Sequence, residues 1–372
     1  MLTIDGSYGE GGGQVLRTSL ALSAITTEPV RIENIRAGRR KPGLRPQHLT
    51  AVRAAAKVCN AQVAGAKLNS RSLAFAPRSA PMAGNYTFDV AHVAKGGSAG
   101  SVSLVLQTIL LPLALAPGTS QVILRGGTHV AWSPPYDYLK RVYLPTMVRI
   151  GIKAKFQIQK WGWYPQGGGV VKATIQGSVG IGQQKENGTP SGGEVIARAE
   201  EELSGLHLVE RGEVFRVRGV SASSNLPKHI RTRQEHAVLQ ILRSNGVNAR
   251  LDVADAPSQG MGTVVFLWSE AENALAGFTS LGERGKPAEQ VAEEASVELL
   301  DYLAGDAALD PYLADQLVLP LALTGASSEC TTQTVTQHLL TNAWVVDQFL
   351  PGRVSVEGRL SEPGVLQIKS RD

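Results

Sequence analysis

Cysteine is almost absent from this sequence. The 372 residues include two cysteines, Cys59 and Cys330. Two thiols cannot form a framework of disulfides, and alone they cannot supply the four ligands of a structural zinc site. The sequence therefore excludes a small disulfide-stabilised secreted domain. It indicates a reducing compartment, so we expect a cytoplasmic protein.

Long hydrophobic runs are missing as well. The longest, residues 104–116, contains Gln107, Thr108 and Pro112, whereas a membrane-spanning helix needs about 20 apolar residues in succession. Residues 1–6 show neither the basic nor the apolar segment of a secretory signal. We therefore expect no membrane association.

Acidic residues are scarce in one segment. Between Arg31 and Lys57 there are six arginines and two lysines against a single acid, Glu33. Several of the cations lie on a loop rich in glycine and proline. A solvated basic surface is one interpretation of this cluster. The rigid, bidentate guanidinium group also suits phosphate, so an anionic ligand is the other, with nucleic acid as one candidate.

Hydrophobic periodicity predicts one order of elements more than once: strand, helix, strand, helix, strand, strand. We infer an α/β (α+β) fold of three repeated βαβαββ units, the third of them interrupted. The predicted strands are residues 2–4, 30–35, 61–63, 73–76, 86–90, 121–125, 153–159, 170–175, 331–336, 354–356 and 365–368. The predicted helices are residues 15–26, 47–58, 97–116, 136–150, 287–303, 312–323 and 339–350.

The interruption follows Gln176. It opens with a Gly/Ser/Pro/Glu-rich linker at residues 180–193, and it carries a predicted helix at 229–245 and a predicted strand at 263–268. We predict a small α/β domain at residues 185–284, inserted into a core of repeats that comprises residues 1–184 and 285–372.

Glycines and polar residues concentrate where the predicted helices begin. Because free N–H groups and the helix dipole favour anions at a helix start, loops from several repeats are expected to build one ligand site. First helices begin near residues 9–14, 97–100 and 312–316, and second helices begin near residues 45–48, 133–136 and 338.

Two glycine clusters need separate interpretation. Gly-Glu-Gly-Gly-Gly-Gln at residues 9–14 matches neither a Walker loop nor a dinucleotide fingerprint. It predicts either a tight strand-to-helix turn or a backbone that approaches phosphates, with Glu10 available for magnesium. The second cluster, residues 161–171, indicates a wide hairpin. His338 precedes an apolar helix, and alone it is either an ordinary histidine or a reactive one.

Five motifs in chain order resemble the RNA 3′-terminal phosphate cyclases. The resemblance covers nearly the whole chain and is weakest in the insert. It implies three units like the C-terminal domain of translation initiation factor three, ATP and Mg²⁺ (or Mn²⁺) as cofactors, and an RNA with a 3′-terminal phosphate as partner. A homodimer is considered as a further partner, and the sequence leaves the oligomeric state open. The motifs are residues 9–14, 35–39, 164–169, 312–316 and 338–342.

The same resemblance implies a reaction. His338 attacks the α-phosphorus of ATP, giving histidyl-AMP and pyrophosphate. AMP then passes to the RNA 3′-phosphate to form RNA-(3′)pp(5′)A, and the 2′-hydroxyl expels AMP to leave a 2′,3′-cyclic phosphodiester. Tyr312 and Pro134 sandwich the adenine, and Glu10 serves the metal. Other implied nucleotide contacts are Gln107, Leu313, Ala314, Asp315 and Gln316, and implied phosphate or RNA contacts are Gln14, Arg17, Arg36, Arg39 and Gln47.

The sequence departs from the family pattern at two positions. Trp161 stands where His or Arg is usual, and His129 stands where an acid is frequent, so local phosphate or metal contacts differ. Residues 91–95 resemble a short insertion before the second glycine turn. Two rivals stay open: a non-catalytic, cyclase-like ribosome-assembly factor, which lacks the histidine, and an enolpyruvyl-transferase-like enzyme, whose motifs are not seen.

Overall fold

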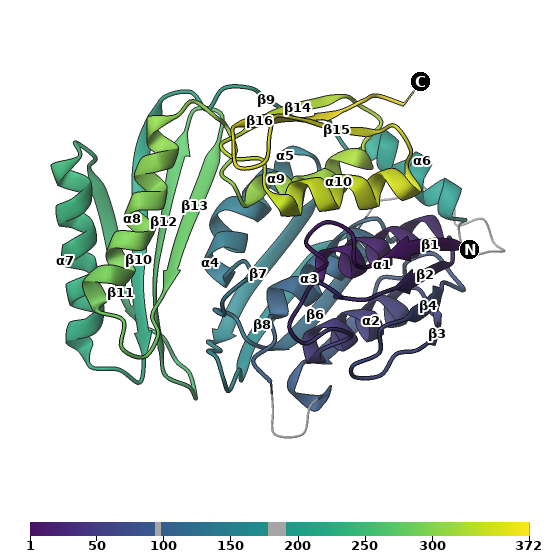
Figure 1. Ribbon diagram of the computed structural model, residues 1–372, viewed down its shortest axis with the longest axis horizontal. Coiled ribbons are helices and arrows are strands. Elements are labelled where there is room, and N and C mark those ends of the chain that lie inside the picture. Colours follow the sequence, from purple (N-terminus) through teal and green to yellow (C-terminus); the bar gives the residue numbers. More distant parts are fainter. Residues whose placement is uncertain (94–97, 178–190, 372) are drawn as a thin grey trace.

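Three sheets of the same topology, each with four strands, form the core of the computed structural model (Figure 1). The structure describes residues 1–93, 98–177 and 191–371. A fourth sheet, with its own helices, forms a separate layer at one end. The predicted α/β fold of repeated βαβαββ units is therefore confirmed.

The first unit follows the predicted order closely. Its sheet has the strand order β1-β2-β4-β3, with β1 parallel to β2 and the other pairs antiparallel. Its elements are β1 (Leu2–Asp5), α1 (Gln14–Thr26), β2 (Val30–Glu33), α2 (Pro46–Val58), β3 (Gln62–Ala64) and β4 (Leu73–Ala76).

The second unit repeats this topology as β5-β6-β8-β7. Its first helix was predicted from residue 97, a position outside the described residues, but α3 begins at Val102, after Ser101 accepts a hydrogen bond from the Leu104 N–H. Its elements are β5 (Asn85–Asp89), η1 (Ala91–Val93), α3 (Val102–Ala114), β6 (Thr119–Gly126), α4 (Tyr136–Tyr138), the π-helical η2 (Leu139–Tyr143), α5 (Leu144–Arg149), β7 (Lys153–Lys160) and β8 (Gly169–Gln176).

The third unit takes its first strand from within the segment predicted as the insert. β9 (His207–Leu208) runs parallel to β14, in a sheet of order β15-β16-β14-β9. This is the strand order of the other two units. The remaining elements are α9 (Leu313–Ala322), β14 (Ser328–Thr332), α10 (Gln337–Phe349), β15 (Val354–Glu357) and β16 (Gly364–Ile368).

The elements that pack with the fourth sheet do not coincide with the insert predicted at residues 185–284. α6 (Gly192–Glu202) packs on α1, whereas α8 (Ala288–Ala304) packs on the fourth sheet and on α7. The predicted linker at 180–193 lies mostly outside the described residues. We propose that the inserted domain runs from β10 to α8, through β10 (Val214–Ser224), α7 (Lys228–Ser244), β11 (Ala249–Asp255), β12 (Gly262–Ala271), β13 (Leu275–Leu281) and α8.

Helices of the three units meet inside the core, because their apolar residues cannot all be covered by one small sheet. α1 contacts α2, α3 and α10, and α10 also contacts α9. α3 is apolar on nearly every side and is almost wholly buried, which is the pattern of a central helix. This packing brings helix starts from the first and third units together. Among the described residues, no helix is both long enough and apolar enough to cross a membrane.

Candidate active site

The glycine loop before α1 lies along one face of α10. The ring of Tyr8 stacks on Trp344 at a centroid distance of 3.9 Å, and Glu10 Oε2 lies 3.2 Å from His338 Nε2. Between them, a Cβ on Gly9 would lie 2.2 Å from Thr341 Oγ1. Residues three apart share a helix face, so Trp344, Thr341 and His338 receive three consecutive loop residues. This register sets Glu10 beside His338.

Glycine is required in this loop because side chains crowd it. A Cβ on Gly12 would lie 2.2 Å from Glu10 Oε1, and a Cβ on Gly13 would lie 2.4 Å from His48 Nε2. Gly11 has a φ of +54°, which favours glycine. The cluster is therefore a tight turn, and it also brings backbone close to the polar groups around His338.

His338 is the second residue of α10. Thr336 caps the helix by accepting a hydrogen bond from the Leu339 N–H at 3.1 Å. The His338 side chain is 48% exposed. Its pKa is lowered from the ordinary value of 6.5, chiefly by desolvation and further by Arg17 and Arg39, while Glu10 opposes this shift. A neutral imidazole with an accessible nitrogen is a competent nucleophile near pH 7.

Two of the predicted phosphate-binding arginines approach this histidine. Arg39 Nη2 lies 2.6 Å from Glu10 Oε2. Arg17 is buried, and burial lowers its pKa to about 10, so it stays cationic at neutral pH. Its Nη2 donates to Gln14 Oε1 at 2.5 Å. Arg36 differs from both, because its Nη1 donates to the carbonyl oxygens of Lys41 and Gly43, each at 2.8 Å, and so stabilises its own loop.

A small pocket lies between α1, α3, α9 and α10. Gln107 on α3 donates to Gln316 on α9 at 2.6 Å, and burial raises the pKa of Asp315 to about 7. Five of the predicted site residues therefore line this pocket, and they come from all three repeats. The lining residues are Gln14, Arg17, Thr18, Ala21, Gln107, Leu111, Tyr143, Asp315, Gln316, Leu319, Pro320 and Asn342.

The remaining predicted residues lie around this pocket in different ways. Tyr312 is 45% exposed, its hydroxyl donates to Glu298 at 3.0 Å, and its ring meets Tyr138 edge-on at 6.4 Å. Pro134 precedes α4, the segment that carries Tyr138. Gln47 on α2 accepts from the Ser101 N–H at 2.9 Å and so ties the first unit to the second. Leu313 and Ala314 are buried, which leaves only their backbone for a ligand.

Sequence reasoning missed Asp310, which joins three parts of the chain. Its carboxylate accepts from the Tyr138 hydroxyl at 2.9 Å, from the Gly277 N–H at 3.0 Å and from the Tyr312 and Leu313 N–H groups at 2.8 Å. Burial raises its pKa to about 6. An Asp three residues before a helix residue is a capping signal that sequence reasoning could have used.

A second contact was also missed, between Thr18 and Asn342. The Thr18 hydroxyl donates to Asn342 Oδ1 at 2.6 Å, and Asn342 Nδ2 donates to the Asp315 carbonyl at 2.5 Å. Asn342 belongs to one of the five motifs, but its partner is 324 positions away in the chain. Such a distance leaves no local signal.

The two departures from the family pattern pack against each other. His129 is buried, stacks on Trp161 at 4.0 Å, and places Nε2 3.1 Å from Asp137 Oδ2. The Trp161 N–H donates to the Pro257 carbonyl at 2.8 Å. Trp161 and His129 thus belong to the junction between the second unit and the inserted domain.

Glu10 has one carboxylate oxygen to spare. Oε1 is buried and has no hydrogen-bond partner, while Oε2 faces Arg39 and His338. An unpaired buried carboxylate oxygen suits a hard divalent cation. The described residues contain no group of three or more His, Cys, Asp or Glu side chains that could hold a metal. Mg²⁺ is commonly bound through one carboxylate together with substrate phosphates, and Glu10 fits that arrangement.

Comparison with known proteins identifies the family. The model of the RNA 3′-terminal phosphate cyclase family matches residues 8–356. A Nostoc punctiforme protein named RNA 3′-terminal phosphate cyclase is 48% identical over 94% of both chains. One of the same name from Methylococcus capsulatus is 48% identical over 98% of this chain and 94% of its own, and one from Pyrococcus furiosus is 40% identical over 99% and 98%. The chain belongs to the RNA 3′-terminal phosphate cyclase family.

Proposed function

We propose that this protein converts an RNA 3′-terminal phosphate into a 2′,3′-cyclic phosphodiester at the expense of ATP. One observation carries the proposal: His338, with its lowered pKa, stands at a helix start beside the carboxylate of Glu10 and within the electrostatic influence of Arg17 and Arg39. This is an accessible neutral nucleophile in an environment that attracts phosphate.

The reaction has three displacements at phosphorus. In the first, a ring nitrogen of His338 forms a bond to the α-phosphorus of ATP, and the bond to the β-phosphate oxygen breaks, so that pyrophosphate leaves. In the second, an oxygen of the RNA 3′-phosphate takes the AMP group and frees the imidazole. In the third, the 2′-oxygen attacks the activated phosphate, its proton is released, and AMP leaves.

The side chains around His338 would position phosphates and neutralise their charge. In phosphoryl transfer these two effects supply most of the rate acceleration. Arg17, Arg39 and Gln14 would hold the triphosphate, and Gln47 would hold the RNA phosphate. Arg36 would act mainly by holding residues 36–45, the arginine loop, in place, given its two hydrogen bonds to carbonyl groups of that loop.

The nucleoside would bind at the start of α9. Tyr312 and Pro134 would enclose the adenine. Around it would lie the side chains of Gln107, Asp315 and Gln316 and the backbone of Leu313 and Ala314. A divalent metal, Mg²⁺ or Mn²⁺, would be held by Glu10 Oε1 and would offset phosphate charge. We further propose a cytoplasmic location, and a homodimer stays a prediction.

The test is a covalent adduct with AMP. Purified protein is mixed with ATP labelled at the α-phosphate and Mg²⁺, without RNA. We expect an acid-labile, base-stable labelled protein, because a phosphorus–nitrogen bond to imidazole hydrolyses in acid. The adduct should be lost in His338→Ala and kept in His236→Ala, whose histidine is an exposed residue of α7.

The rivals give other results. A ribosome-assembly factor or an enolpyruvyl-transferase-like enzyme would form no adduct. The proposal is overturned if the wild-type protein acquires no label, or if the His338→Ala variant is labelled.

A further inference from the structure

The outer face of the second sheet carries an unusual charge. In β8, Val171, Ala173 and Ile175 are buried beneath the helices, so the alternate residues point outward. Lys172 pairs with Ile123 on β6 and with Gln157 on β7, which places all three on the outer face. The same register adds Arg125, Lys153, Lys155 and Lys160.

These cations outnumber the acids on the same face. In the part of the chain that the structure describes, no ion pair joins any of the five to a carboxylate. The one acid on this face is Asp89 on the edge strand β5, which stands opposite Arg125 in the register and lies 3.4 Å from His92. The outer face of the second sheet therefore carries a net positive charge.

The two sister sheets provide an internal comparison. They share the topology, but their outer faces are acidic on balance. The first sheet presents Arg31 together with Asp5 and Glu33, which are opposite each other in the register, and the described strands of the third present Glu329 and Glu357 without lysine or arginine. The repeat does not itself require a basic outer face, so the charge of the second sheet belongs to that unit alone.

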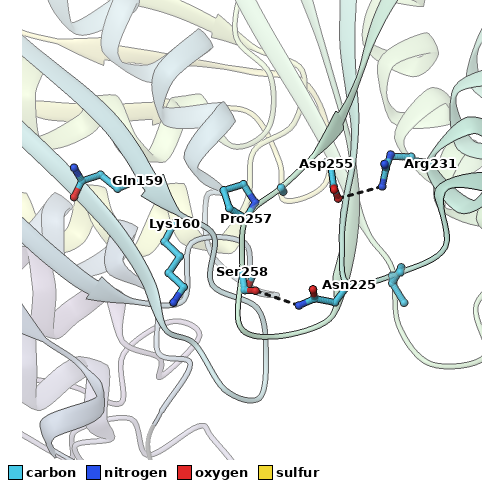
Figure 2. A pocket seen from close by; sticks show the side chains of 9 residues that line it. Gln159, Lys160, Asn225, Arg231, Asp255, Pro257 and Ser258 are labelled. Atoms are coloured by element: carbon cyan, nitrogen blue, oxygen red, sulfur yellow. Dashed lines mark hydrogen bonds and ion pairs between the residues drawn. The ribbon is translucent and has the colours of Figure 1, made fainter.

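A cleft continues this face toward the inserted domain. It has a volume of about 580 Å³ and lies where β7 ends (Figure 2). Lys160 reaches in from β7, and Arg231 lies on the opposite side, held by Ser223 Oγ at 2.9 Å and Asp255 Oδ1 at 3.2 Å. Asn225 and Ser258 add polar groups, so the cleft suits a sugar–phosphate chain.

The β7–β8 loop leads from this cleft to the candidate active site. A Cβ on Gly167 would lie 2.6 Å from the Ser98 carbonyl oxygen, which shows how closely the loop touches the segment before α3. In that segment the Ser101 N–H donates to Gln47 on α2. Gln47 follows Arg45 at the end of the arginine loop. The basic sheet, the cleft and the site of His338 are thus connected by contacting residues.

We propose that the outer face of the second sheet and the cleft beside it bind the sugar–phosphate backbone of the RNA on the 5′ side of its reacting 3′-phosphate. The identity of the ligand as RNA rests on the proposed function. The eight residues of β7 span about 25 Å, enough for several nucleotides. Lysines contact phosphates without reading bases, so binding is independent of sequence.

The experiment compares RNA lengths. Lys153→Gln, Lys155→Gln and Lys172→Gln are combined, and binding is measured by fluorescence anisotropy over a range of salt concentrations. The ligands are a 20-nucleotide RNA and a dinucleotide, both ending in a 3′-phosphate. We expect affinity for the long RNA to fall at least ~10-fold and the slope of log K against log salt to flatten by about 2, since each phosphate contact on a single strand contributes ~0.7. Binding of the dinucleotide should not change.

A matched variant removes the same charge elsewhere: Arg31→Gln, Lys67→Gln and Arg359→Gln, all exposed and off this face. It should bind both ligands as wild type does. Unchanged long-RNA binding in the first variant, or equal loss in the matched one, overturns the proposal. Because binding needs no chemistry, its result is separate from AMP-adduct formation, which both variants should retain. An adduct missing from wild type would contradict the proposed function alone.

Discussion

Glu10 and His338 face each other across two repeats, with Oε2 3.2 Å from Nε2. The same oxygen receives Arg39 at 2.6 Å. One carboxylate thus contacts both the candidate nucleophile and the arginine loop, while its other oxygen has no hydrogen-bond partner. The contact depends on a loop from the first unit lying in register on a helix from the third.

Replacing Glu10 by Gln should slow formation of the AMP adduct by at least ~10-fold, in the range seen when an orienting partner is lost. The pH dependence should move as well. Protonated imidazole cannot attack, and Glu10 is the group that raises the pKa of His338. We therefore expect the acid limb of the rate profile, already below pH 6.5 in wild type, to shift further down in Glu10→Gln. Glu200→Gln, which loses a surface pair with Arg371, should leave both quantities unchanged. An upward shift would contradict the assignment.

The stack of Tyr8 on Trp344 should position Glu10 without touching substrate. Trp344→Ala removes the partner ring, and we expect adduct formation to fall ~10-fold or more because a displacement of about 1 Å near the reacting atoms is costly. Trp344→Phe keeps a ring and should restore most of the rate. Stopped-time labelling with ATP at saturating concentration measures both. If Phe and Ala behave alike while the melting temperature is unchanged, the stack has no positioning role.

Asp310 should be a stability residue of the core. Asp310→Ala would leave the Tyr138 hydroxyl and the N–H groups of Gly277 and Tyr312 without this acceptor, whereas the Leu313 N–H would keep the backbone carbonyl oxygen of residue 310 at 3.3 Å. Each unsatisfied buried donor costs about 1–3 kcal/mol, so we expect a loss of at least ~3 kcal/mol in the free energy of unfolding, measured with denaturant. Asp310→Asn keeps an acceptor oxygen and should lose less. Asp306→Ala, at an exposed position, is the control.

Asp315 should make stability depend on pH. Burial raises its pKa to about 7 from 3.8, so the folded protein holds this proton more tightly than the unfolded chain. The resulting stabilisation is present below pH 3.8 and is lost as pH rises through about 7. Asp315→Asn has no such loss. Its melting temperature relative to that of wild type should therefore be higher at pH 8 than at pH 5, by roughly 2–4 °C. The exposed Asp301→Asn should show no gain. A constant difference at both pH values would refute the prediction.

Much of the fold was predictable because periodicity is local. The alternation in β7 and the apolar run of α3 are read from neighbouring residues, and both appear where they were expected. Helix starts were predicted less accurately, since α3 begins at Val102 and not near residue 97. The insert predicted at residues 185–284 includes β9, because a strand of two residues is too short to leave a pattern in the sequence.

The sequence by itself determined the three repeats, the basic loop, the glycine turn and the helix that carries His338 near its start, because each depends on residues close together in the chain. Tertiary structure alone decided that Glu10 meets His338, that Thr18 meets Asn342 and that Asp310 meets Tyr138. These partners are separated by 328, 324 and 172 positions, respectively. Which helix faces which loop is set by the packing of buried surfaces, a property of the whole core that local patterns do not contain.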